Sequence, residues 1–285
     1  MSSYNPNVGS GYVSKADRLA VKEQFTGIKF KSGLRVFQDH CGFIDGEIHT
    51  FIGTKGSGKS TWSKTILAEI LYQDLSALLY ISEETKNKYL TGLNNDLLVL
   101  NKTEEKLEEA MSRLLVMSEI DAGFDNEAAT LLEIKETIEG AKIDIFIFDN
   151  FTTSFMSELN INKQSAILRS FKNLAQICNI PVVLFFHTGK MYDTKRLDGD
   201  NVRGSGTAVN IGSYNYLIAQ HLENGNLRNF IYTEKARYHS RANKKMYEMK
   251  YDPRVGMFTG CDITTMEKFQ ALSVGATQRN AEYQK

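Results

Sequence analysis

The stretch FIGTKGSGKSTW (Phe51–Trp62) decides the fold class, because it follows the pattern G-x-x-x-x-G-K-[ST]. Glycines let the backbone curl until successive N–H groups converge on phosphate oxygens, and the positive end of the next helix adds to the attraction. Residues 46–53 carry apolar side chains as a strand would, and residues 63–72 carry them at helical spacing. The sequence therefore predicts a strand, a phosphate-binding loop and a helix, and a solvated surface turn is the alternative interpretation.

A loop of this kind predicts a bound nucleotide, which we expect to be ATP with Mg²⁺. The expected nucleotide-binding residues are Gly53, Thr54, Lys55, Gly56, Ser57, Gly58, Lys59, Ser60 and Thr61. Lys59 supplies a mobile positive charge and Ser60 a hydroxyl ligand for Mg²⁺. Asp149 ends the apolar segment IDIFIFD (143–149), so it is the second expected Mg²⁺ residue, unless it only caps the next element.

ATP hydrolysis also requires a group that orients or activates water. Glu83 and Glu84 directly follow the apolar segment ALLYIS (77–82), so either carboxylate is a candidate general base. The alternative is that these two acids only open a helix. His187 follows the apolar segment PVVLFF (181–186) and is a candidate sensor of the γ-phosphate, or else an ordinary core histidine.

Composition limits the classes of protein to consider. The chain has 285 residues with 34 Lys and Arg against 34 Asp and Glu, so its net charge is zero, which argues against a histone-like polycation. Its three cysteines are far apart and form no C-x-x-C pair, which indicates a reducing, cytoplasmic setting without a zinc site. No apolar run approaches ~20 residues and the N-terminus lacks a signal-peptide pattern, so we expect no membrane association.

Strand-like and helix-like segments alternate, which predicts an α/β fold with a mostly parallel central sheet and helices on both faces. We expect helices at 88–120 with a break near 94–96, at 127–139 and at 163–178, and further strands at 214–222 and 229–238. Residues 1–25 are expected to form an N-terminal segment that could dock on another subunit, 26–262 the ATPase domain, and 263–285 a polar C-terminal tail.

Charge is distributed unevenly. Residues 83–139 hold fourteen acids and six bases, whereas residues 228–254 hold eight bases and three acids. These segments are either ordinary solvated faces or the two unlike sides of a head-to-tail contact between subunits.

Four segments carry a family resemblance: TGIKFKSGLRVFQDHCGFIDGEIHTFIGTKGSGKST (26–61), ILRSFKNLAQICNIPVVLFFHT (167–188), DNVRGSG (200–206) and KAR (235–237). They resemble RecA-fold P-loop ATPases, most closely the motor domain of DnaB-type hexameric replicative helicases, although His187 stands where those helicases usually have glutamine. The resemblance implies a RecA-like fold, a homo-oligomeric ring, and a Lys235–Arg237 pair that reaches the neighbouring subunit's ATP site. Residues two apart on a strand point to the same face, as such a pair requires.

The resemblance also implies loops that contact single-stranded DNA. The expected DNA-binding residues are Lys190, Lys195, Arg196 and Arg203, which could bind phosphates, with Tyr192 stacking on a base. We therefore expect a DNA helicase or translocase that hydrolyses ATP. The alternatives are a recombination or annealing factor with ATP-gated DNA binding, a signalling or packaging ATPase without a DNA role, and a small-molecule kinase.

Overall fold

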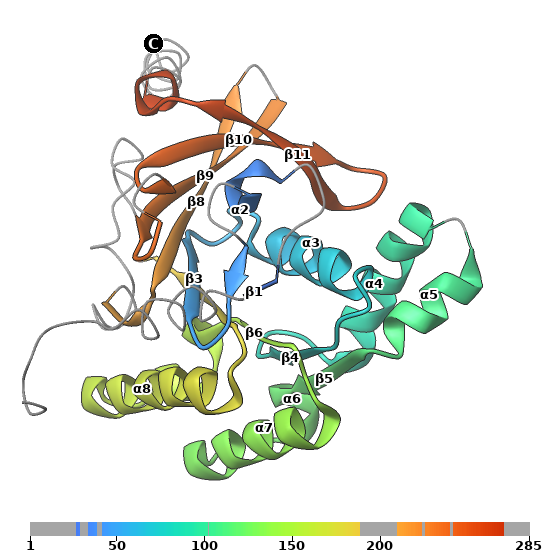
Figure 1. The fold of residues 1–285 in the computed structure, drawn as a ribbon, viewed down its shortest axis with the longest axis vertical. Coiled ribbons are helices and arrows are strands. Elements are labelled where there is room, and N and C mark those ends of the chain that lie inside the picture. The colour runs from blue at the N-terminus through green and yellow to red at the C-terminus, as the bar shows by residue number, and fades with distance from the viewer. Residues whose placement is uncertain are drawn as a thin grey trace, which may run out of the picture.

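The computed structural model describes residues 27–28, 34–38, 42–101, 103–188, 210–223, 226–239 and 242–270. A sheet of nine strands in the order β11-β10-β9-β8-β3-β7-β6-β4-β5 runs through this part of the chain (Figure 1). The strands are β3 (Ile48–Gly53), β4 (Ala77–Ile81), β5 (Leu114–Ser118), β6 (Ile145–Asp149), β7 (Val182–His187), β8 (Tyr214–Glu223), β9 (Asn226–Ala236), β10 (Lys245–Asp252) and β11 (Met257–Thr264).

The sheet is mixed. From β5 to β8 all neighbours pair in parallel, whereas β8, β9, β10 and β11 pair antiparallel. The short strands β1 (Gly27–Ile28) and β2 (Phe43–Ile44) form a separate antiparallel pair. The protein is therefore an α/β protein with a large mixed sheet, whose parallel half fits the expected central sheet.

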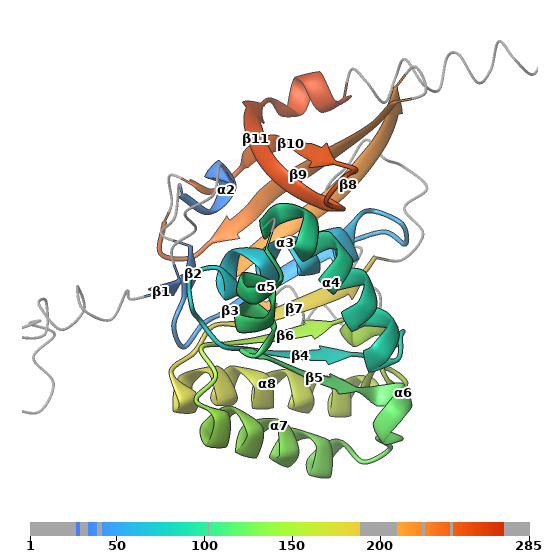
Figure 2. The ribbon, with the colours of Figure 1, turned by 90° about the vertical axis from the view of Figure 1, so that its right-hand side faces the viewer.

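Helices cover both faces of the parallel half, as expected. Figure 2 shows α3 (Lys59–Leu71), α4 (Lys86–Asn101) and α5 (Glu104–Met111) on one face, and α7 (Glu127–Ala141) and α8 (Ile161–Cys178) on the other. The other helical segments are short and include α2 (Arg35–Gln38), α6 (Glu119–Ala122), the 3-10 turns η1 (Phe151–Thr153) and η2 (Phe155–Ser157), and residues 266–270. Strands buried on both faces are continuous apolar runs, which explains why β4, β6 and β7 were predictable.

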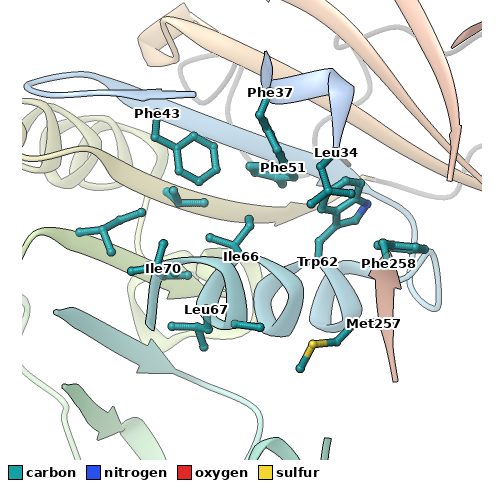
Figure 3. Packing of buried hydrophobic residues seen from close by; sticks show 14 of the residues in the cluster. Leu34, Phe37, Phe43, Phe51, Trp62, Ile66, Leu67, Ile70, Met257 and Phe258 are labelled. Atoms are coloured by element: carbon teal, nitrogen blue, oxygen red, sulfur yellow. The ribbon is translucent and has the colours of Figure 1, made fainter. Parts of the chain in front are cut away.

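The hydrophobic core between α3 and the sheet holds the first turn of α3 in place. Trp62, on the first turn of α3, is fully buried, and its ring centroid lies 5.6 Å from that of Phe37 and 4.8 Å from that of Phe258 (Figure 3). Phe37 belongs to α2 and Phe258 to β11, so segments far apart in the sequence meet around one ring. This packing anchors the glycine-rich loop that precedes α3.

Two expectations about secondary structure were wrong, and two strands were missed. Residues 94–96 lie within the continuous helix α4, and residues 114–118 form the edge strand β5 instead of helix. Strands β10 and β11 were not predicted, and β11 runs to Thr264 across the expected start of the polar tail. Phe269 is buried, with its ring 5.1 Å from that of Phe230, so packing extends at least to this residue. Residues 1–25 and 271–285 lie outside the described ranges.

Candidate functional site

The carboxyl ends of four parallel strands bring the expected site residues together. Gly53, at the end of β3, pairs with His187 at the end of β7, and Ile81 of β4 pairs with Asp149 at the end of β6. Glu83 follows β4 by two residues. Ligands of open α/β sheets bind outside this edge, so the topology alone concentrates these side chains in one place.

The glycine-rich loop 53–60 curls as its sequence predicts. Gly56 and Gly58 have φ values of 79° and 89°, which side chains with a Cβ rarely adopt, and Gly58 is the N-cap of α3. The buried Lys59 donates hydrogen bonds from Nζ to the carbonyl oxygens of Gly53 (3.1 Å) and Thr54 (2.6 Å). Burial lowers the pKa of Lys59 to about 8, although nearby carboxylates act in the opposite direction.

Asp149 is a buried carboxyl next to these charges. Burial raises its pKa to about 7, although a hydrogen bond with Ser63 and the positive charge of Lys59 act to lower it. Ser63 lies on α3, so Asp149 faces the start of this helix. The hydroxyl of Ser63 also lies 3.1 Å from that of Tyr89. Ser60, by contrast, is exposed at the pocket.

Glu83 and Glu84 have different surroundings. The Glu83 carboxylate lies in the pocket and accepts a hydrogen bond from Nδ2 of Asn150 at 2.8 Å, and its Oε1 lies 3.2 Å from Nε2 of His187. Burial acts to raise the pKa of Glu83, but the hydrogen bonds from His187 and Asn150 outweigh it, so the pKa lies below its usual value. Glu84 instead pairs with Lys88 one turn along α4, at 3.5 Å, and is not among the residues that line the pocket.

His187 is held neutral at ordinary pH. Burial and the neighbouring charge of Lys59 lower its pKa, more than the contact with Glu83 raises it. The backbone N–H of His187 donates to Oγ1 of Thr152 at 2.8 Å, which ties β7 to the turn that follows β6. A neutral imidazole in this position can act as a hydrogen-bond donor or acceptor toward a ligand.

Lys59, Ser60, Glu83 and His187 line a pocket of ≈ 490 Å³ that extends from the glycine loop to the antiparallel hairpins, whereas the buried Asp149 is not among its lining residues. Its volume suits a ligand of nucleotide size. The lining residues are Lys55, Gly56, Gly58, Lys59, Ser60, Thr61, Glu83, Asn150, His187, Gln220, Leu227, Asn229, Tyr251 and Phe258. The last five come from β8 to β11, and together with Asn150 they were missed by the sequence analysis.

Several polar atoms at the loop lack a partner within the described part of the chain, which makes the site suitable for an anionic ligand. Oγ of Ser57, Nδ1 of His187 and Oγ1 of Thr188 are all buried without a hydrogen bond. Buried polar groups are normally paired, so these atoms call for a ligand or solvent. In the described residues no three His, Cys, Asp or Glu side chains form a metal cluster, so any metal here would need ligand oxygens in addition to Ser60 and Asp149.

Lys235 and Arg237 lie at the other end of the sheet. Tyr214 pairs with His49 near the start of β3, and on its other side with Ala236, so these two basic residues are near the amino end of β3. Nζ of Lys235 donates to the carbonyl oxygen of Asn210 at 3.3 Å, and burial, followed by the charge of Arg237, lowers its pKa. β9 ends at Ala236, so only Lys235 is on the strand, and Arg237 follows it, exposed.

The remaining expectations fall largely outside what the structure describes. The expected DNA-binding residues Lys190, Lys195, Arg196 and Arg203, with Tyr192, all lie in 189–209, which is not among the described ranges. Within the described ranges, no helix has the length and apolar character needed to cross a membrane.

The chain was compared with protein-family models and with curated proteins. No protein-family model matches the chain, and no curated protein matches it either.

Proposed function

We propose that the chain is a RecA-fold ATPase that moves along single-stranded DNA as a DnaB-like ring, with ATP sites shared between subunits. The observation that carries the proposal is the pocket at the carboxyl ends of β3, β4, β6 and β7, in which Lys59, Glu83 and His187 surround one glycine loop. A cationic loop, a carboxylate and a neutral imidazole at one edge are the groups that phosphoryl transfer to water needs.

Each of these groups has a distinct role in the proposed hydrolysis. Lys59 and the N–H groups of the loop bind the phosphates, and the carboxylate of Glu83 accepts a proton from the attacking water. The lowered pKa of Glu83 keeps that carboxylate ionised at neutral pH. Ser60 and Asp149 are the residues that would hold Mg²⁺, which supplies positive charge to the phosphate oxygens when bound.

The residues at the end of the pocket far from the glycine loop suit the nucleoside part of the proposed ligand. Tyr251 and Leu227 are both exposed and line the pocket, and the ring of Phe258 lies 6.1 Å from that of Tyr251. Aromatic and aliphatic faces beside a phosphate loop suit a planar base, because stacking needs little more than a flat apolar surface.

The distant Lys235 and Arg237 support shared sites. They lie near the amino end of β3, whereas their own chain's glycine loop follows its carboxyl end, so they cannot complete that pocket. An exposed arginine beside a partly buried lysine fits a pair that enters an adjacent subunit. The acidic segment 83–139 and the basic segment 228–254 give the chain two unlike charged segments for such a head-to-tail contact.

The first experiment measures the ATPase rate with and without single-stranded DNA, and unwinding of a forked duplex. We expect DNA to stimulate hydrolysis and ATP to drive unwinding. Stimulated hydrolysis without unwinding would favour the recombination or annealing factor. Hydrolysis that is indifferent to DNA at low salt would argue against a DNA motor.

The second experiment tests shared sites by mixing two inactive variants. Arg237→Ala should bind ATP but lose turnover by about 10³-fold or more, the range for an arginine finger. Lys59→Ala should lose binding or turnover in its own pocket. If sites are shared, mixed oligomers contain some pockets with both residues intact, so activity should return on mixing. Two proteins that stay inactive together would speak for independent sites.

A further inference from the structure

Asn150 lies where three strand ends of the candidate site meet. It directly follows β6, is buried, and lines the pocket together with Glu83 and His187. Its backbone N–H donates to Oγ of Ser82 at 3.2 Å, and that hydroxyl donates to the carbonyl oxygen of Asn150 at 2.9 Å. The residue is thus fixed to the end of β4 through its main chain, independently of its side chain.

The orientation of the Asn150 amide is determined by its neighbours. Oδ1 accepts hydrogen bonds from the backbone N–H and from Oγ1 of Thr153, both at 3.1 Å, so the oxygen is committed to the turn η1. The NH₂ group consequently faces the pocket. Nδ2 lies 2.8 Å from Oε1 of Glu83 and 3.1 Å from Nε2 of His187.

These contacts form a closed triangle, because Nε2 of His187 is also 3.2 Å from Oε1 of Glu83. A neutral imidazole nitrogen either donates or accepts a hydrogen bond, so Nε2 cannot donate to Glu83 and accept from Asn150 at the same time. When Nε2 carries the proton it donates to Glu83, and in the other tautomer the second amide hydrogen of Asn150 can reach Nε2. In both tautomers the Asn150 amide donates to the Glu83 carboxylate and contributes to its position.

We propose that Asn150 is a positioning residue for hydrolysis, whose amide holds the Glu83 carboxylate at the place where it takes the proton from water. The inference rests on the proposed ATPase function. The competing explanation is that Asn150 serves only as the N-cap of η1, since asparagine commonly caps such turns.

Two substitutions separate the explanations. Asn150→Asp and Asn150→Ser both keep a side-chain oxygen that can cap η1, and both remove the amide donor, but only the aspartate adds charge beside Glu83. We expect kcat for ATP to fall by about 10²-fold in both, the loss typical of a misplaced catalytic group, with nucleotide affinity and melting temperature retained. The aspartate should be the slower of the two, because it repels the Glu83 carboxylate.

The matched controls are Asn126→Asp and Asn126→Ser. Asn126 caps α7 through Oδ1, which accepts from the backbone N–H groups of Ala128 (3.1 Å) and Ala129 (3.0 Å), and it does not line the pocket. These variants should keep the wild-type rate. If Asn150→Ser also keeps the wild-type rate, Asn150 is only a cap and the inference is overturned.

A double-mutant cycle tests whether Asn150 acts through Glu83. In a Glu83→Gln background, Asn150→Ser should lower kcat little further, because the group that it positions is already gone. If the fold-losses in kcat of the two single variants multiply in the double variant, the inference is overturned, and the ATPase proposal stays intact. A wild-type chain that hydrolyses no nucleotide would instead overturn the proposed function, and this inference with it.

Discussion

Replacing Asp149 by asparagine should change how the stability of the nucleotide-free protein depends on pH. Burial raises the pKa of Asp149 from 3.8 to about 7, so the folded state holds a proton that the unfolded state has already lost. Stability from this group is present at low pH and is lost as pH rises toward 7. Asp149→Asn removes that dependence, since the amide does not titrate in this range.

The magnitude follows from the pKa. Between pH 5 and pH 7 the folded carboxyl goes from fully protonated to half ionised, so at about 1.4 kcal/mol per pH unit wild type should lose about 2 kcal/mol that the variant keeps. The difference in unfolding free energy between the two proteins should therefore shift by about 2 kcal/mol in favour of the variant. In a chain of this size that is roughly 4 °C in melting temperature.

The assay is thermal and urea unfolding at pH 5, 6, 7 and 8, in the presence of a chelator and without nucleotide. Asp252→Asn is the control, because Asp252 is half-buried and hydrogen bonds from Arg254 lower its pKa to about 2, below the range scanned. A difference between wild type and Asp149→Asn that stays constant from pH 5 to pH 8 would refute the reasoning. Asp149 would then titrate normally, and the dry pocket between Lys59 and Glu83 would not exist.

Three further changes test other parts of the site. Gly53→Ala should abolish nucleotide binding in a fluorescence titration, because the new Cβ would lie 2.3 Å from Oγ of Ser57 and 2.9 Å from a backbone oxygen. The control is Gly123→Ala, which has open space around it. It should cost only about 1–2 kcal/mol of stability and leave nucleotide binding intact. Glu83→Gln should bind ATP with unchanged affinity but hydrolyse it about 10²-fold more slowly or worse in single-turnover assays, and equal rates would exclude Glu83 as the base. Tyr251→Ala should raise KM for ATP by about 10-fold, corresponding to one lost stacking contact, while Leu132→Ala, at an exposed site on α7, should not change it.

The parallel half of the sheet was predictable because its strands are buried on both faces. Such strands appear in the sequence as short runs of apolar residues, and the glycine loop fixes where one of them ends. The edge strand β5 was missed because Leu114 and Val116 are buried while Leu115 is exposed, a pattern too short to separate from the helical residues before it. In β10, charged residues such as Lys245 and Lys250 interrupt the apolar side chains of a half-exposed hairpin.

The candidate site was predictable to the extent that it lies on strand ends. Lys59, Glu83 and His187 were found because each directly follows or begins a recognisable element. Asn150 was missed because an asparagine after a strand has no motif, and its contacts depend on the register of β4 and β7, which are distant in the sequence. The pocket wall at Tyr251 was missed with the strand that bears it, since its place opposite the loop depends on how the hairpins fold back.

β9 has its two ends in different surroundings. Leu227 and Asn229 line the pocket, while Lys235 is near the opposite end of the same strand, roughly 25 Å away for eight extended residues. β8 and β10 pair with β9 on either side, and the pairing with β8 shifts register between Thr233 and Lys235. If the proposed ring forms, β9 would connect one subunit's pocket with the basic residues proposed to serve the next, so nucleotide in one pocket would influence turnover in its neighbour.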